Sequence, residues 1–117
     1  MLQCVSAITL ATHDMAAAVG FYEALGFVLR AGGPGARFTS FHAGSGYLNL
    51  VEAPAGQTWG WWGRVIFHVD DVDRQHGRAL AAGLAPAFAP RDAPRGERYF
   101  HILDPDGHEL SFASPLG

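Results

Sequence analysis

The sequence predicts an α+β fold in which two repeated β-α-β-β-β modules curl their mixed sheets around a shared cavity. Three observations lead to this prediction. At 117 residues and 49% hydrophobic residues, the chain suits one domain with a substantial core. Short segments alternate apolar and polar residues like half-buried strands, and two segments between them have helical spacing. The two halves of the chain also repeat this order of elements.

The first half reads as a strand, a helix and three further strands. The helix cap is Thr12, His13 or Asp14, and Gly26 suits the position after the last turn. The predicted elements are a strand over Val5–Ala11, a helix over Met15–Leu25, and strands over Phe27–Arg30, Arg37–His42 and Gly46–Glu52.

The last two of these strands form a hairpin with a testable register. With the two-residue loop Gly44-Ser45, Ser40 lies opposite Asn49 and His42 lies opposite Tyr47. The packed face then consists of alternating residues of the same strands: Phe41, Leu48 and Leu50.

The second half follows a stretch of linker composition, Ala53–Gly60. Its predicted elements are strands over Trp61–Val69, about Ala85–Ala89, about Arg98–Leu103 and His108–Ser114, with a helix from an Asp70-Asp71 cap to Ala82. Prolines make the strand after the helix irregular or an edge. The charged segment Arg91–Arg98 reads as a solvated loop, with a lid or rim as the alternative.

The repeat is ungapped across each strand–helix–strand unit. A shift of 57 positions places Asp14 on Asp71 and Gly26 on Gly83. A shift of 62 places Leu48-Asn49-Leu50 on Leu110-Ser111-Phe112. The single domain, 1–117, therefore divides into module one at about 1–53, a linker at about 54–60 and module two at about 61–117.

Composition excludes several classes of partner. The net charge is −3 and no basic run occurs, so we expect no nucleic-acid partner. No apolar run reaches the ~20 residues of a membrane span, and the N-terminus does not resemble a signal peptide. With the lone Cys4, these features predict a cytoplasmic location and no membrane partner.

Two motifs resemble a known family. The helix end Gly20–Phe27 (GFYEALGF) and the turn Leu103–Gly107 (LDPDG) resemble the vicinal oxygen chelate superfamily of glyoxalases, extradiol dioxygenases and bleomycin-resistance proteins. The resemblance covers nearly the whole chain. It implies the two-module fold and a homodimer, but no single activity, because this superfamily includes both enzymes and binding proteins.

The resemblance also implies four metal-ligand positions, one in each quarter of the fold. Counted from the motifs, they fall on Ala7, Asn49, Arg64 and Ser111. Alanine and arginine cannot ligate a divalent cation, and the amide and hydroxyl are weak neutral ligands. The sequence therefore predicts no metal site at these positions and no cofactor.

Histidines leave a relocated metal site open. His42, His68 and His101 can face the cavity, and Glu109 shares the face of Ser111. The alternative is structural: no HxH or HxxxH pair occurs among the six histidines. Ser111 with His68 or His101 imitates a nucleophile–base pair, but no orienting carboxylate is identifiable.

Aromatic and polar residues describe the predicted cavity. Trp61 is expected in the core or a dimer interface, whereas Trp62 contacts either ligand or protein. Arg64 needs an acceptor there, either an anionic ligand or an internal acid such as Glu52 or Glu109. The predicted ligand-binding residues are Phe38, Ser40, Tyr47, Asn49, Trp59, Trp62, Arg64, His68, Tyr99, His101 and Ser111.

These residues favour a metal-independent protein that binds and sequesters a planar aromatic compound such as an antibiotic. The alternative is a lyase or oxidoreductase of the glyoxalase or dioxygenase type, with a relocated metal or with His68 or His101 as base. A third possibility is a dimerising scaffold with a vestigial pocket.

Overall fold

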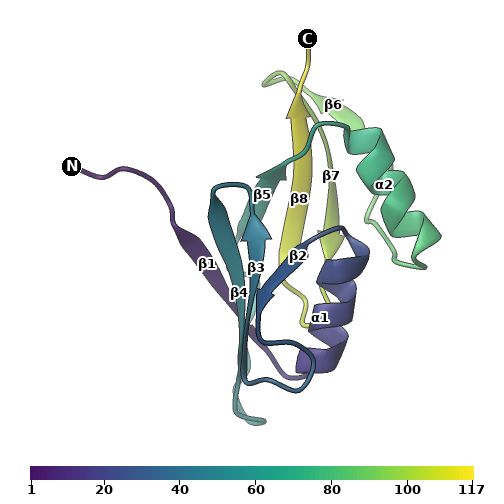
Figure 1. Cartoon of the computed structure of the whole chain (residues 1–117). Coiled ribbons are helices and arrows are strands. Elements are labelled where there is room, and N and C mark those ends of the chain that lie inside the picture. The colour runs from purple at the N-terminus through teal and green to yellow at the C-terminus, as the bar shows by residue number, and fades with distance from the viewer. The chain divides into compact units, whose positions relative to one another are not determined.

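Two β-α-β-β-β modules make up the chain (Figure 1). The computed structural model describes residues 1–117 and divides them into Met1–Thr58 and Trp59–Gly117, called here the first and second modules. Each module is a four-stranded mixed sheet with one helix. The predicted α+β class with repeated modules is therefore confirmed.

The first module has the strand order β1-β4-β3-β2, with β1 and β4 parallel and the other pairs antiparallel. In the β3–β4 hairpin Ser40 lies opposite Asn49 and His42 opposite Tyr47, which confirms the predicted register. Its elements are β1 (Ala7–Thr12), α1 (Met15–Ala24), β2 (Val28–Ala31), β3 (Phe38–Ala43) and β4 (Gly46–Glu52).

The second module repeats this topology with the order β5-β8-β7-β6. The parallel pair is β5 with β8, in which Arg64 lies opposite Glu109. In the antiparallel pair of β7 and β8, His101 lies opposite Ser111. Its elements are β5 (Arg64–His68), α2 (Val72–Ala81), β6 (Arg91–Ala93), β7 (Glu97–Leu103) and β8 (Glu109–Pro115).

The two helices have the same capping geometry, 57 positions apart. The carboxylate of Asp14 accepts a hydrogen bond from the N–H of Ala17, and that of Asp71 accepts one from Arg74. After each helix comes a glycine with positive φ, Gly26 and Gly83, a conformation that costs any other residue strain. Neither helix is long and apolar enough to cross a membrane.

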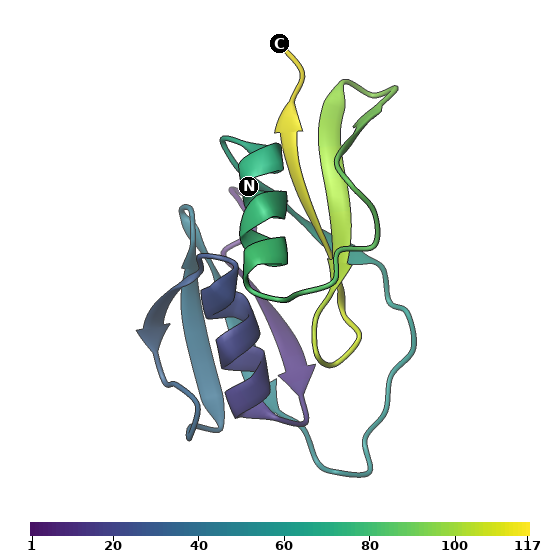
Figure 2. The same cartoon turned by 90° about the vertical axis from the view of Figure 1, so that its right-hand side faces the viewer.

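Each helix packs against one face of its own sheet (Figure 2). In the first module the ring of Tyr22 on α1 lies 5.9 Å from that of Phe41. In the second module α2 contacts β7 and β8, whose side chains Phe100 and Phe112 have ring centres 5.5 Å apart. All four side chains are buried, and burying each contributes about 1.5–3 kcal/mol. Alternate residues of the strands point to the opposite, helix-free face of each sheet.

One predicted strand starts too early and another is absent. β5 begins at Arg64 rather than Trp61, because Gly63 has φ +116° and turns the chain just before the strand. Ala85–Ala89 forms no strand, although the N–H of Ala87 donates to the carbonyl oxygen of His101. The loop predicted over Arg91–Arg98 instead contains β6 and the start of β7.

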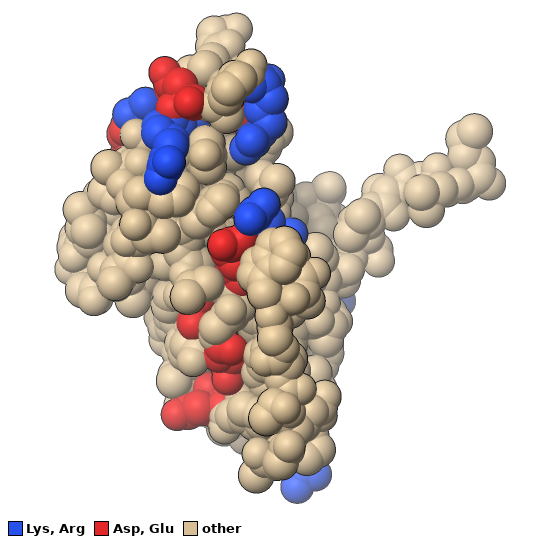
Figure 3. Space-filling model, turned by 180° about the vertical axis from the view of Figure 1, so that it is seen from behind, with Lys and Arg blue, Asp and Glu red and all other residues tan.

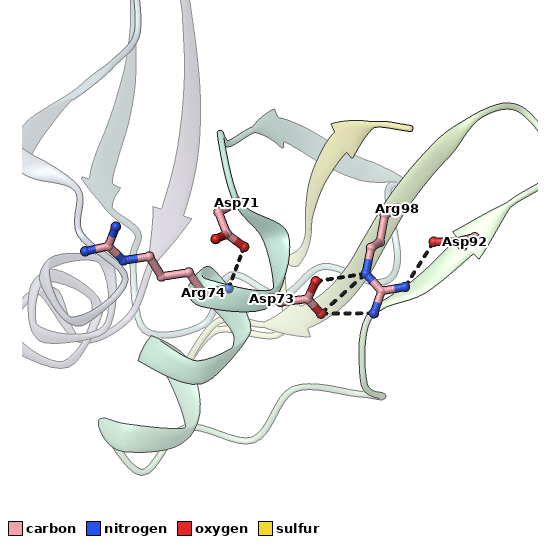
Figure 4. A network of polar contacts seen from close by, with 5 residues as sticks. All are labelled: Asp71, Asp73, Arg74, Asp92 and Arg98. Atoms are coloured by element: carbon pink, nitrogen blue, oxygen red, sulfur yellow. Dashed lines mark hydrogen bonds and ion pairs between the residues drawn. The ribbon is translucent and has the colours of Figure 1, made fainter. Parts of the chain in front are cut away.

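An arginine network joins three elements of the second module (Figure 4). Arg98 on β7 bonds both carboxylate oxygens of Asp73 on α2, at 3.0–3.3 Å, and Asp92 on β6 at 3.0 Å. The hydrogen bonds from Arg98 lower the pKa of Asp73. Through Arg98, this network links α2 to the edge strand β6 on the helix side of the sheet.

Candidate functional site

The helix-free face of the first module brings together the four residues predicted there. Phe38, Ser40, Tyr47 and Asn49 occupy alternating positions of β3 and β4, with Ser40 and Asn49 directly opposite each other. Ser40 is fully buried, whereas the ring of Phe38 is 48% exposed. The face therefore combines an accessible aromatic ring with central polar groups.

Arg30 reaches over this face from a register shift in β2. Its guanidinium lies 4.3 Å from the ring centre of Tyr47, and one N–H donates to Ser40 Oγ at 3.4 Å. The amide nitrogen of Asn49 donates to Thr9 Oγ1 at 3.4 Å. The amide oxygen of Asn49 is buried and has no hydrogen-bond partner, so it is available to a ligand that donates a proton.

On the helix-free face of the second module, the acid that pairs with Arg64 is Glu109. Partial burial acts to raise the pKa of Glu109, but hydrogen bonds from Arg64 and Trp61 and nearby positive charge lower it on balance. Glu109 is therefore held as a carboxylate. Glu109 is one of the two internal acids that the sequence offered as partners of Arg64.

Trp61 belongs to the same group and does not pack in the core, one of the two places predicted for it; the other, a dimer interface, stays a prediction. Trp61 precedes β5 and is 69% exposed, and its indole N–H donates to Glu109 Oε2 at 3.4 Å. The guanidinium of Arg64 lies 5.6 Å from the ring centre. The prediction of a core position came from starting the strand at Trp61, whereas β5 begins at Arg64, after Gly63.

His101 and Ser111 lie side by side at the centre of this face. Partial burial lowers the pKa of His101; Glu109 acts to raise it, and Arg64, Arg91 and Arg95 act to lower it further. The imidazole is therefore neutral near pH 7. The hydroxyl oxygen of Ser111 is buried without a hydrogen-bond partner, which leaves a polar group available to a ligand.

His68 lies at the other end of the face and has a structural partner. Its Nε2 is 2.6 Å from Glu97 Oε2, while Arg95 bonds the other oxygen of the same carboxylate at 3.0 Å. The hydrogen bonds from Arg95 and His68 lower the pKa of Glu97. This pairing places His68 in an ion-pair group rather than beside His101.

Three rings, which we call the aromatic triad, gather beside His101: Phe88, Tyr99 and His101 itself. Their centres are 5.2–5.6 Å apart in edge-on or tilted contacts. Arg91 lies over Phe88 and Arg95 over Tyr99. The sequence analysis missed Phe88 and Arg91. Phe88 is the one large side chain between Pro86 and Pro90, but the irregular backbone there gives no alternation from which to infer its direction.

Trp59 and Trp62, both predicted to contact ligand, hold the turn between β7 and β8. Trp59 stacks on His108 at 5.3 Å and donates to the carbonyl oxygen of Asp106. The indole N–H of Trp62 donates to His108 Nδ1 at 2.7 Å. The strand predicted from Trp61 does not include Trp62, since both tryptophans precede β5.

Comparison with known proteins identifies the family. A model of the Glyoxalase/Bleomycin resistance protein/Dioxygenase superfamily matches residues 5–112. The chain belongs to this superfamily. No curated protein sequence matches it.

Solved structures share the superfamily fold. TioX from Micromonospora sp. ML1 has 27% identity and a TM-score of 0.79, covering 97% of this chain and 100% of its own. Lactoylglutathione lyase from Agrobacterium tumefaciens has 23% identity and a TM-score of 0.77, covering 96% and 93%. A bleomycin-binding protein complexed with bleomycin has 21% identity and a TM-score of 0.74, covering 97% and 98%.

The residues at the superfamily's metal-ligand positions do not fit a divalent metal. Ala7 has no donor atom, and Arg64 brings a positive charge that is already paired with Glu109. Asn49 and Ser111 offer only neutral oxygens. Within neither module do three or more His, Cys, Asp or Glu side chains gather as metal ligands.

Proposed function

We propose that this chain is a metal-independent small-molecule binding protein that sequesters a planar aromatic compound, such as an antibiotic, as a cytoplasmic homodimer. The proposal uses the helix-free faces of both sheets. That these two faces line one cavity stays a prediction. The bleomycin complex of a protein with the same fold supports a binding role for this architecture.

The observation that carries the proposal is the composition of the second sheet's helix-free face. Where the superfamily resemblance implies metal ligands, this face has the Arg64–Glu109 ion pair and the unpaired Ser111 hydroxyl. Beside them lies the aromatic triad. Rings with a few fixed polar groups suit a flat, partly polar organic ligand.

Tryptophan fluorescence tests binding directly. All three tryptophans lie in the second module, and Trp61 contacts Arg64 and Glu109 on the face in question. We expect aromatic antibiotics or flavins to quench this emission with a dissociation constant below about 10 μM. Replacement of Tyr99 by alanine should weaken quenching at least fivefold. A panel in which nothing binds tighter than high micromolar would contradict the proposal.

Metal independence has its own test. Protein purified without chelator should contain no stoichiometric divalent metal by elemental analysis. Adding Zn²⁺, Mn²⁺ or Ni²⁺ should leave its unfolding temperature and its ligand affinity unchanged, because the donor set does not suit such ions. Metal-dependent stabilisation or binding would contradict the proposal.

A second candidate function follows from the neutral His101. A half-buried imidazole with a lowered pKa next to the free Ser111 hydroxyl suits a general base in a metal-free lyase or isomerase. Turnover of lactoylglutathione in excess EDTA would support this candidate if His101→Asn abolished it. Absence of turnover, with ligand binding intact, would leave the binding role.

A further inference from the structure

The acidic side chains on the second sheet are already matched to positive partners. Glu109 pairs with Arg64. Glu97 is shared by Arg95 and His68. In the network of Figure 4, Asp73 and Asp92 both pair with Arg98. No acid of this sheet is therefore left for a further cation.

Among the arginines on the strands of this sheet, Arg64, Arg91 and Arg98, these pairings leave Arg91 over. It makes no ion pair, and its guanidinium carbon lies 3.5 Å from the ring centre of Phe88. A stacked guanidinium uses its flat face for the ring, whereas its N–H groups point outward in the guanidinium plane. Stacking therefore fixes Arg91 and leaves its hydrogen-bond donors for another group.

On the helix-free face, Arg91 adds a positive charge that no acid balances, because Glu97 and Glu109 are paired with Arg95 and Arg64. Arg91 is opposite Tyr99 in the β6–β7 pair, so it lies on the same side of the sheet as the aromatic triad. Arginines also gather, with some acids, at the top of Figure 3, where Figure 1 places β6. Burial is the largest effect on the pKa of His101 and lowers it; Glu109 acts to raise it, and Arg64, Arg91 and Arg95 act to lower it.

We propose that the ligand of this face is an anionic aromatic compound, whose ring contacts the aromatic triad and whose carboxylate or sulfonate is bound by Arg91. The inference rests on the proposed binding function and adds the charge class of the ligand. Guanidinium groups bind such anions through paired, charge-assisted hydrogen bonds. The positive charge of Arg64 is already matched by Glu109, to which its Nε donates, whereas no acid matches that of Arg91.

Two dyes with the same ring system test the charge class. 8-Anilinonaphthalene-1-sulfonate is anionic, and 1-anilinonaphthalene is its neutral counterpart; both gain fluorescence in apolar sites. We expect the native chain to bind the sulfonate at least fivefold more tightly. Arg91→Gln should remove most of this preference while leaving the affinity for the neutral dye within twofold. The preference should also fall as salt rises.

The matched control is Arg74→Gln. Arg74 also has an exposed side chain without an ion pair, so its replacement by glutamine changes the net charge by the same amount. It lies on α2 and not on the strands of the proposed site. It should leave both affinities unchanged. Equal effects of the two variants, or no preference in the native chain, would overturn the inference and leave the binding function standing. If neither dye nor any compound of the quenching panel bound, the proposed function and the inference would both fail. Urea unfolding of each variant verifies that the fold is retained.

Discussion

A single oxygen at the centre of the second sheet links stability to ligand binding. The Ser111 hydroxyl is buried with no partner, and such groups destabilise a fold by about 1–3 kcal/mol. We expect Ser111→Ala to raise the free energy of unfolding by about 1 kcal/mol, measured by urea titration, and to weaken ligand binding. Ser40→Ala is the control, since Ser40 Oγ accepts a hydrogen bond from Arg30. A larger loss of stability in Ser111→Ala than in Ser40→Ala would show that Ser111 is satisfied.

The lowered pKa of His101 makes the stability of the fold depend on pH. Burial, the largest effect, lowers its pKa below the ordinary value of 6.5. The unfolded chain therefore takes up a proton at this site at a higher pH than the folded chain does. Stability is fully present above about pH 6.5 and is lost as the pH falls through 6.5 toward the folded value.

Urea unfolding at about pH 7.5 and about pH 5.5 measures this loss. His101→Asn should lose less stability between the two conditions than the native chain does. The carboxylates with lowered pKa values, Glu97 and Glu109, titrate from their ordinary 4.5 downward and leave this window undisturbed. Identical pH profiles for the two proteins would contradict the shift at His101.

At the scale of elements, the helix caps are the most predictable feature. Asp71 caps α2 with its carboxylate, whereas the adjacent Asp70 makes no such bond. Asp71→Ala should reduce the free energy of unfolding by about 1 kcal/mol, and Asp71→Asn should retain most of it. Asp70→Ala should change little. Comparable losses at both positions would assign the effect to surface charge instead of capping.

The elements that the sequence predicted well are those fixed by local chemistry. Both helices and the Gly44-Ser45 hairpin register follow from short-range rules, and the structure confirms them. Of the predicted cap candidates, the structure selects Asp14 for the first helix and Asp71 for the second. The strand predicted over Trp61–Val69 starts too early, because the sequence pattern continues across Gly63, whereas the positive φ of Gly63 interrupts the strand conformation there. β6 is a three-residue, mostly polar strand that is defined by its pairing with β7, so no local sequence pattern predicts it.

In the candidate site, too, local sequence patterns predict some features, whereas others depend on contacts between distant segments. Which residues of a strand share a face follows from period two, so Ser40 with Asn49 and His101 with Ser111 could be foreseen. Which groups then pair depends on side-chain reach between distant segments. The sequence left the partner of Arg64 open between a ligand and an internal acid, and only the β5–β8 register brought Glu109 to it.

For the whole molecule, one backbone plan carries two different surfaces. The strand pairings repeat between modules, yet the first helix-free face has Tyr47 and Asn49 where the second has Glu109 and Ser111. The two modules therefore share a pattern of strand pairing but differ in the side chains on their helix-free faces. This separation of scaffold from surface explains why the superfamily is evident from the motifs, while the ligand must be inferred from individual side chains.

Assembly is the last expectation at this scale. Apolar side chains remain exposed, among them Val28 at 64% on the edge strand β2, and edge strands are common sites of pairing between chains. We expect light scattering to give twice the 12.5 kDa mass of one chain, and the urea midpoint to rise with protein concentration. Val28→Ser should weaken the dimer, whereas Leu80→Ser, on α2 and 55% exposed, should not. A mass of one chain at about 100 μM protein would contradict a homodimer.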